Sequence, residues 1–171
     1  SWVLDDVIVK SGSSNIDSGV GIRSVSGDKS VFAYSNDFNF DNLITAANMS
    51  KCIVEHGQSR TIKIGEEKKI KRLYESVSPL DYGKDETKVL FLKNIDKYIR
   101  DKDSRVDQVI VNLVGVYDSV FVLNTDGVNV FDDRPLVRFS VMVILKVGER
   151  RESGSAGGGG RNSYDQVIDS K

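Results

Sequence analysis

The sequence contains one cysteine, one histidine and two prolines in 171 residues. A single cysteine excludes an internal disulfide and any zinc site built from several cysteines. A single histidine excludes a zinc centre based on histidines, and no G-x-S-x-G motif is present for serine hydrolysis. We therefore expect no catalytic residue and no metal ligand in this chain, and a reducing, cytoplasmic setting.

Long apolar runs and an excess of one charge are also missing. Val141–Leu145 is typical of the longest apolar run, far short of the roughly 20 residues that cross a bilayer. Charged residues arrive by Leu4–Asp6, so we expect neither a signal peptide nor a membrane partner. Lys+Arg 24 against Asp+Glu 25 argues against direct nucleic-acid binding by bulk charge. The basic residues between positions 63 and 72 are interrupted by Glu66 and Glu67, which favours a solvated loop.

The first third of the chain has the pattern of β-structure. Trp2–Lys10 is predicted to be one strand, and Ser11–Gly19 a turn-rich break. Two further β-rich runs within Val20–Ser35 flank Gly27 and Asp28, a spacing that predicts a two-residue hairpin turn.

Two helices are predicted in the middle of the chain. The first begins near Phe40, with Asn39 or Asp41 as its cap, and Gly57 suits the position just beyond its end. The second covers Asp85–Asp103, with Asp85 as its cap. Four of its residues are predicted to share one face: Phe91, Ile95, Tyr98 and Ile99.

From Val106 to Val147 the pattern is β again, in four runs joined by short breaks. In the last run Val137, Phe139 and Val141 alternate with polar residues such as Arg138 and Ser140, which predicts opposite faces of a sheet. The expected order is β-β-β-α-α-β-β-β-β. Runs of strands joined by short turns favour an α+β fold with a mainly antiparallel or mixed sheet and two principal helices.

The glycine run at Gly157–Gly160 is the least usual stretch of the chain. Arg161 and Asn162 follow it, where a phosphate-binding P-loop needs Lys and then Ser or Thr. Two interpretations stay open. The run is a flexible linker or hairpin tip, or it is a wall without side chains that another backbone or a ligand approaches closely.

Other candidate residues have plain structural interpretations. His56 is predicted to terminate the first helix, and Cys52 to be a small buried residue of that helix. The pair Asp132-Asp133, followed by Arg134, predicts either a salt-bridged turn or part of a cleft.

Two long stretches of the chain, in this order, resemble the TldD/PmbA family of zinc metallopeptidases, also called modulators of DNA gyrase. The first is SWVLDDVIVKSGSSNIDSGVGIRSVSGDKSVFAYS, and the second is VYDSVFVLNTDGVNVFDDRPLVRFSVMVILKVGERRESGSAGGGGR. The similarity is strong at DDRPLVR and SGSAGGGGR, and weak from Ser59 to Tyr82.

The resemblance implies a cytoplasmic metallopeptidase that cleaves unfolded peptides, in peptide maturation and antitoxin degradation. Its zinc would be held by a His-Glu-x-x-x-His helix and a distant cysteine in a C-terminal half. Here Gly57 follows Glu55-His56 and no second histidine exists, so the resemblance implies no catalytic or metal-binding residue in this chain. Implied partners are a PmbA/TldE-type subunit and unfolded peptides, and a homo-oligomer is also compatible. A stand-alone interaction module without enzymatic activity is the alternative.

The chain is therefore expected to be the front part of such a protein. Residues 1–150 would form an N-terminal domain that lacks its own start, and residues 151–171 a glycine-rich segment leading to a catalytic domain outside this chain. Residues that could line a peptide cleft are Gly157, Gly158, Gly159, Gly160, Arg161, Asp133 and Arg134.

Overall fold

The structure is a computed structural model and describes residues 1–52, 65–68 and 71–169. The chain divides into two compact units, one made of Ser1–Ser14 with Lys63–Lys171 and the other of Asn15–Ile62. No helix in the described part of the chain is both long and apolar enough to cross a bilayer.

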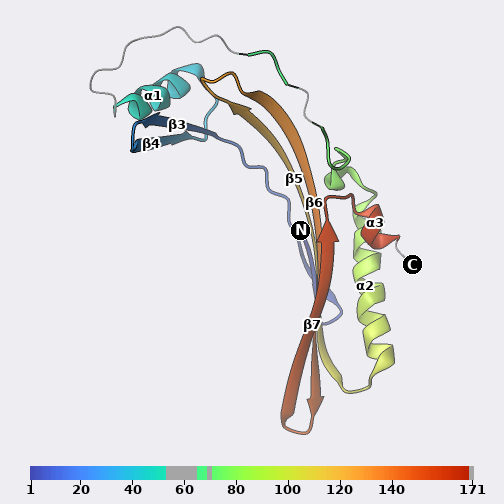
Figure 1. Ribbon diagram of the computed structural model, residues 1–171. Coiled ribbons are helices and arrows are strands. Elements are labelled where there is room, and N and C mark those ends of the chain that lie inside the picture. The colour runs from blue at the N-terminus through green and yellow to red at the C-terminus, as the bar shows by residue number, and fades with distance from the viewer. Residues whose placement is uncertain (53–64, 69–70, 170–171) are drawn as a thin grey trace. The chain divides into compact units, whose positions relative to one another are not determined.

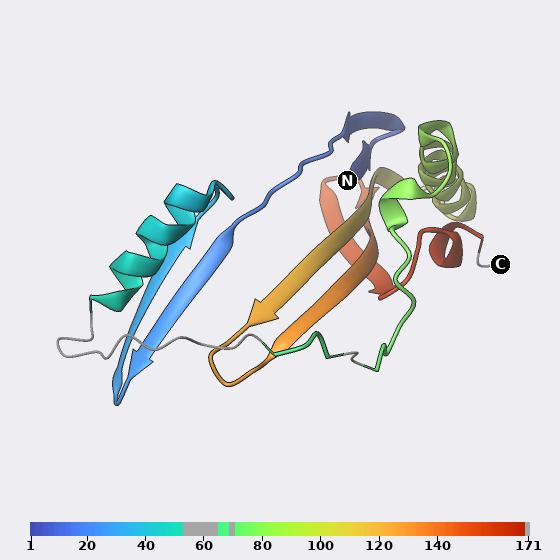
Figure 2. The same ribbon diagram turned by 90° about the horizontal axis from the view of Figure 1, so that it is seen from above.

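The smaller unit is a β-hairpin with one helix on one side of it (Figure 2). Its elements are β3 (Val20–Ser26), β4 (Lys29–Ser35) and α1 (Phe40–Lys51). Ser26 pairs with Lys29, so the predicted two-residue turn is confirmed, with Gly27 at a φ of +58°. Asn39 caps α1, as predicted, because its side chain accepts a hydrogen bond from the Asp41 N–H.

Two sequence interpretations of the first helix have different outcomes. Cys52 is exposed, so the prediction that it is buried is wrong: α1 ends at Lys51, and Cys52 is the C-cap residue beyond the packed turns. His56 and Gly57 lie outside the described residues.

The larger unit is a five-stranded antiparallel sheet in the order β2-β1-β5-β6-β7 (Figure 1). Its strands are β1 (Trp2–Asp5), β2 (Ile8–Gly12), β5 (Val106–Leu123), β6 (Asn129–Val147) and β7 (Arg150–Gly160). Its helices are the 3-10 turn η1 (Pro79–Asp81), α2 (Asp85–Lys102) and the short α3 (Asp165–Ile168). The α+β class, the mainly antiparallel sheet and the two principal helices are confirmed.

The distribution of strands differs from the predicted order. Four strands precede α1 and three follow α2, whereas three before and four after were predicted. The predicted single strand Trp2–Lys10 is a hairpin, because the chain reverses at Asp6 and Val7, both at positive φ. No glycine marks this turn, which is why the pattern did not reveal it. The four β-runs after Val106 form two continuous strands, β5 and β6, and the glycine run adds a third strand.

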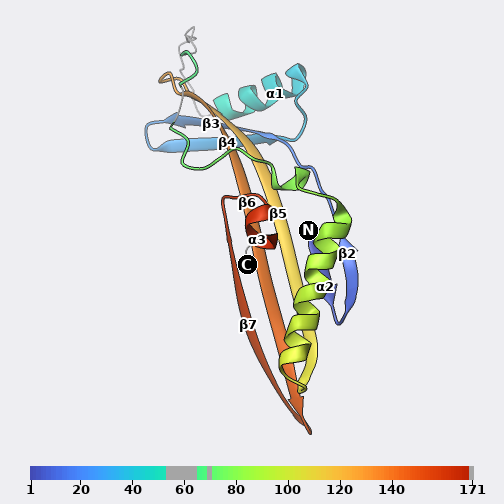
Figure 3. The ribbon, with the colours of Figure 1, turned by 90° about the vertical axis from the view of Figure 1, so that its right-hand side faces the viewer.

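One face of the sheet carries the core, and we call it the helix face because α2 packs on it (Figure 3). Leu4, Val109, Val111, Leu113 and Val137 are fully buried there. Leu92 of α2 is fully buried in the same cluster, and Phe91 packs on Phe139 with ring centroids 5.5 Å apart. Side chains alternate along β6, so Arg138 and Ser140 lie on the opposite face, which we call the far face. The predicted alternation is confirmed.

The second helix matches its predicted span, but its predicted cap is wrong. Lys84 is the N-cap residue and makes no side-chain capping bond, whereas Asp85 is the first helical residue. An acidic residue in the first turn stabilises a helix through its dipole. Of the predicted face, Phe91, Ile95 and Ile99 pack on the core, and Tyr98 remains 60% exposed.

Candidate functional site

The glycine run forms the end of β7, an edge strand of the sheet. Gly157–Gly160 pair with Ser140–Val137 of β6 in continuous antiparallel register. The linker interpretation is therefore wrong, because strand pairing fixes these residues. The interpretation of close backbone approach agrees with the structure at two positions.

Gly157 and Gly159 have no room for a side chain. A Cβ on Gly157 would lie 2.6 Å from the Phe139 carbonyl oxygen, and a Cβ on Gly159 would overlap the Val137 carbonyl oxygen. Both obstacles are backbone atoms of β6, which cannot rotate away. The β6–β7 pairing therefore requires glycine at these two positions.

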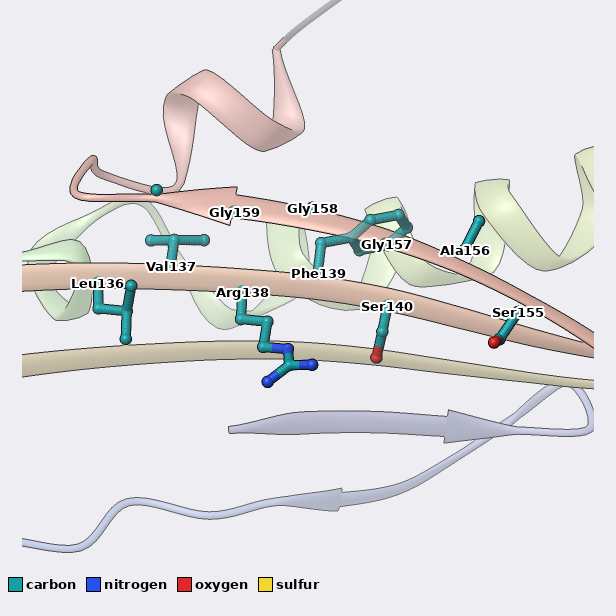
Figure 4. Close-up of a pocket in the computed structure, with 11 residues that line it drawn as sticks. Leu136, Val137, Arg138, Phe139, Ser140, Ser155, Ala156, Gly157, Gly158 and Gly159 are labelled. Atoms are coloured by element: carbon teal, nitrogen blue, oxygen red, sulfur yellow. The ribbon is translucent and has the colours of Figure 1, made fainter.

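Gly154 and Gly158 are different, because a Cβ at either would meet nothing within 4 Å. A shallow cavity of about 570 Å³ spans this end of β6 and β7, from Leu136 to Ser140 and from Ser155 to Gly160. Figure 4 shows that Val137 and Phe139 point to one side of the strands, while Arg138 and Ser140 point to the other.

The outer edge of β7 has no strand partner within the described part of the chain. β7 stops at the pair Val137↔Gly160, whereas β6 continues to Asn129 paired with β5 (Figure 1). The sheet edge is therefore stepped, and its outermost rows of backbone N–H and C=O groups belong first to β7 and then to β6.

Arg161 lies at this step. Its Nη1 donates a hydrogen bond of 3.3 Å to the Pro135 carbonyl oxygen, and its guanidinium lies 5.7 Å from the centre of the Tyr74 ring. Tyr74 in turn donates to Asp132 at 3.3 Å. The segment before η1 thus holds Arg161 against the edge of β6.

Asp133 and Arg134 are neighbours in sequence but lie on opposite faces of β6. Asp133 accepts hydrogen bonds from Ser119 at 2.7 Å and Ser76 at 2.8 Å, and these bonds, that of Ser119 first, lower the pKa of its carboxyl group. Arg134 pairs with Asp132 across 2.7 Å on the far face. The salt bridge was predicted, but the turn is wrong, because all these residues lie inside β6.

The structure thus separates the predicted candidates. Gly157–Gly160 and Arg161 lie together at the stepped edge, whereas Asp133 and Arg134 do not form one cleft with each other. Sequence reasoning missed Tyr74 and Ser76, which bond to Asp132 and Asp133. They lie in the stretch with the weakest family similarity, and no spacing signal pointed to them.

The described residues do not fit a catalytic metal. They contain no group of three or more His, Cys, Asp or Glu that could hold an ion. The adjacent carboxylates Asp132 and Asp133 point to opposite faces, and hydroxyl groups already bind Asp133. His56 lies outside the described residues.

Two family models match the chain. The model for PmbA/TldA metallopeptidase domain 1 matches residues 1–53, and the model for the PmbA/TldA metallopeptidase central domain matches residues 79–170. Neither model covers residues 54–78, which lie between α1 and α2, and together the two models match most of the chain.

Curated relatives agree with this match. The chain is 38% identical over 174 residues to the "Metalloprotease TldD homolog" of Haemophilus influenzae, covering 99% of this chain and 36% of that protein. It is 38% identical over 170 residues to the protein of the same name from Buchnera aphidicola, covering 98% of this chain and 35% of that protein. The chain therefore spans about a third of the length of these relatives.

A solved structure shows the same fold. TldE from Thermococcus kodakarensis matches with a TM-score of 0.67 over 98% of this chain and 39% of that one, at 12% sequence identity.

Proposed function

Because this chain belongs to the TldD/PmbA metallopeptidase family, we propose that it is the non-catalytic front part of a zinc metallopeptidase that cleaves unfolded peptides in the cytoplasm. Its role is to guide the substrate along a wall of the reaction chamber and to contact a PmbA/TldE-type partner subunit. The division into residues 1–150 and residues 151–171 remains part of this proposal, with the second stretch supplying β7 and then leading to a catalytic domain outside this chain.

The free edge of β7 is the observation that carries the proposal. An extended peptide that pairs with this edge becomes a sixth strand and bonds through its backbone, so its side chains need not follow a particular sequence. The strand has 11 residues, Arg150–Gly160. Its first three are charged, and the eight that follow Glu152 are all glycine, serine or alanine. Such a strand leaves space beside the paired peptide for side chains of any size.

Arg161 marks the end of the proposed peptide track. Its guanidinium has five N–H donors in a fixed plane, and one of them bonds to the Pro135 carbonyl. We propose that its other donors bind carbonyl groups of a peptide at the point where the peptide leaves β7. Asp133 and Arg134, on opposite faces of β6, have supporting roles around the stepped edge.

The chemistry of cleavage belongs to the polypeptide beyond this chain. Zinc activates water for attack on a peptide bond when it is bound by residues that the described part of this chain does not supply. The residues of this chain bind and orient the peptide, and we expect the chain alone to cleave nothing.

A peptide with blocked backbone amides tests the proposal. A fluorescent, unstructured ten-residue peptide is titrated with the chain and followed by anisotropy, beside a shuffled version and a version N-methylated at three consecutive central residues. Consecutive methylation is needed because a peptide bound without sequence preference can slip by one residue and escape an alternating pattern. We expect shuffling to change Kd by less than about threefold, and N-methylation to weaken binding at least about tenfold, which corresponds to about 1.4 kcal/mol.

Equal binding of the N-methylated peptide would refute edge pairing, as would loss of binding on shuffling. A stand-alone interaction module is the second candidate, favoured by the same free edge. Full-length protein separates the two, because cleavage of the bound peptide is expected only if this chain serves a peptidase.

A further inference from the structure

A second groove lies on the helix face of the sheet, next to the C-terminal half of α2. It has a volume of about 650 Å³. One wall is formed by Ile95, Tyr98 and Ile99 of α2. The floor is formed by four residues of β6: Phe139, Val141, Val143 and Leu145. The groove is apolar and open, and it is separate from the outer edge of β7.

The wall opposite α2 is β7, which presents only glycine or alanine on this face from Gly158 to Gly154 and a charged side chain, Glu152, at the Leu145 end. The pairing register puts Gly158 beside Phe139, Ala156 beside Val141 and Gly154 beside Val143. At Gly154 and Gly158 a Cβ would have free space, so the packing within this chain does not require glycine there. The β6 backbone explains why Gly157 and Gly159, on the far face, are glycine. It does not explain glycine at positions 154 and 158.

The dimensions of the groove match one α-helix. α2 packs mainly on β5 and β1, and β7 is two strands away from β5, or roughly 10 Å at about 4.8 Å per strand. Neighbouring helices on a sheet pack about 8–10 Å apart. From Phe139 to Leu145 the floor is roughly 20 Å long at about 3.3 Å per residue, the length of about 13 helical residues. Because Gly154 and Gly158 carry no side chains, a helix can approach this part of the sheet closely.

We propose that this groove is the seat of an amphipathic helix from the polypeptide that follows residue 171 in full-length members of the family. The chain covers 36% and 35% of the two curated relatives, so most of their length lies outside the stretch it matches. The last described residues already lie on the helix face. Val167 and Ile168 of α3 pack against the core, and Tyr82 donates a hydrogen bond of 2.9 Å to Asp169.

The expected helix therefore starts beside the groove, and its apolar stripe, spaced i, i+3 or i+4 and i+7, covers Ile99 and Val141. This inference concerns the face of β7 and does not depend on the peptide track along its edge.

The test places a large side chain at the Phe139 end of the groove with Gly158→Leu, because Gly158 pairs with Phe139 and a Cβ there meets nothing within 4 Å. The matched control is Ser153→Leu on the same strand: Ser153 borders the groove, but it pairs with Ile144, so its side chain is on the far face. Both variants are made in the 171-residue chain and in the same chain continued to the full length of its relatives, and the apparent Tm of each is measured. In the short chain we expect Gly158→Leu to leave Tm unchanged or raise it, since the groove is open. In the long chain we expect it to lower Tm by at least about 4 °C, while Ser153→Leu stays within about 2 °C of the parent.

Three results would overturn the inference. The first is an unchanged Tm for Gly158→Leu in the long chain. The second is an equal loss for both variants there. The third is a concentration-dependent dimer of the long chain, seen by light scattering, that Gly158→Leu converts to a monomer, because the occupant would then be a second copy. The peptide titration of the preceding section uses the unsubstituted short chain, whereas this inference is tested by the Tm of the variants, so failure of the peptide track and failure of this inference are distinguishable.

Discussion

Adjacent glycines in β7 are expected to respond to the same substitution with opposite signs. In Gly157→Ala the new methyl group would lie 2.6 Å from the Phe139 carbonyl oxygen and 3.1 Å from the Ser140 Cα. The first contact is about 1 Å shorter than an optimal non-bonded separation. Because both obstacles are main-chain atoms, the two strands must separate locally.

The cost follows from the register. The four pairs from Gly157 to Gly160 form the end of the β6–β7 ladder, and separation there loses two to four hydrogen bonds. At about 1 kcal/mol for each bond, Gly157→Ala is expected to lower the free energy of unfolding by about 2–4 kcal/mol. Gly158→Ala has free space around its Cβ and is expected to raise it by about 0.5–1 kcal/mol, since glycine inside a strand is unfavourable.

Urea unfolding followed by tryptophan fluorescence measures both effects. Trp2 is the single tryptophan and packs against the core of the larger unit, so its signal reports on that unit. Equal stability of the two variants within about 0.5 kcal/mol would refute the assigned register and the close approach of β6. The m-value serves as the control, because a changed slope would mean that the unfolded or native state itself had changed.

Three further predictions use the same chain. Val7→Gly is expected to raise the free energy of unfolding by about 1 kcal/mol, because a β-branched residue at a φ of 71° is strained and Asp-Gly suits this turn; a lower urea midpoint would contradict this. Hydrogen bonds lower the pKa of the Asp133 carboxyl, so its contribution to stability is present above its unfolded pKa of about 3.8 and is lost as pH falls below that value. Asp133→Asn should therefore flatten the fall of the urea midpoint below about pH 4, and an unchanged acid profile would speak against the Ser119 and Ser76 bonds. Metal analysis of the purified chain should find no stoichiometric zinc, and a chelator should leave its Tm unchanged; a stoichiometric ion would refute the expectation that this chain supplies no metal site.

The sequence predicted what depends on local pattern. The helix Asp85–Lys102, the cap at Asn39, the Gly27-Asp28 turn and the alternation along β6 all rest on side-chain periodicity or on glycine's freedom at positive φ. These signals act over a few residues, so one sequence contains them in full.

The structural features that the sequence did not predict depend on residues that are distant in sequence. The turn at Asp6 and Val7 is held because β1 pairs with both β2 and β5. The glycine run is a strand because the β6 backbone pairs with it, although glycine by itself disfavours strands. Asp132, Asp133 and Arg134 look like a turn, but β5 pairs opposite them throughout. The bonds from Tyr74 and Ser76 join residues more than 50 positions apart, which no local pattern encodes.

The position of β1 has a consequence for synthesis of the chain. Trp2 pairs with Leu113, so β1 cannot pair with β5 until more than 100 further residues have been synthesised. At about 5–20 residues per second, the wait is on the order of ten seconds on a ribosome. During this interval the smaller unit, inserted between the two parts of the larger one, is already complete. A central domain produced from residues 79–170 alone would leave β5 without its neighbour β1, so the larger unit needs strands from both of the family domains that sequence comparison separates.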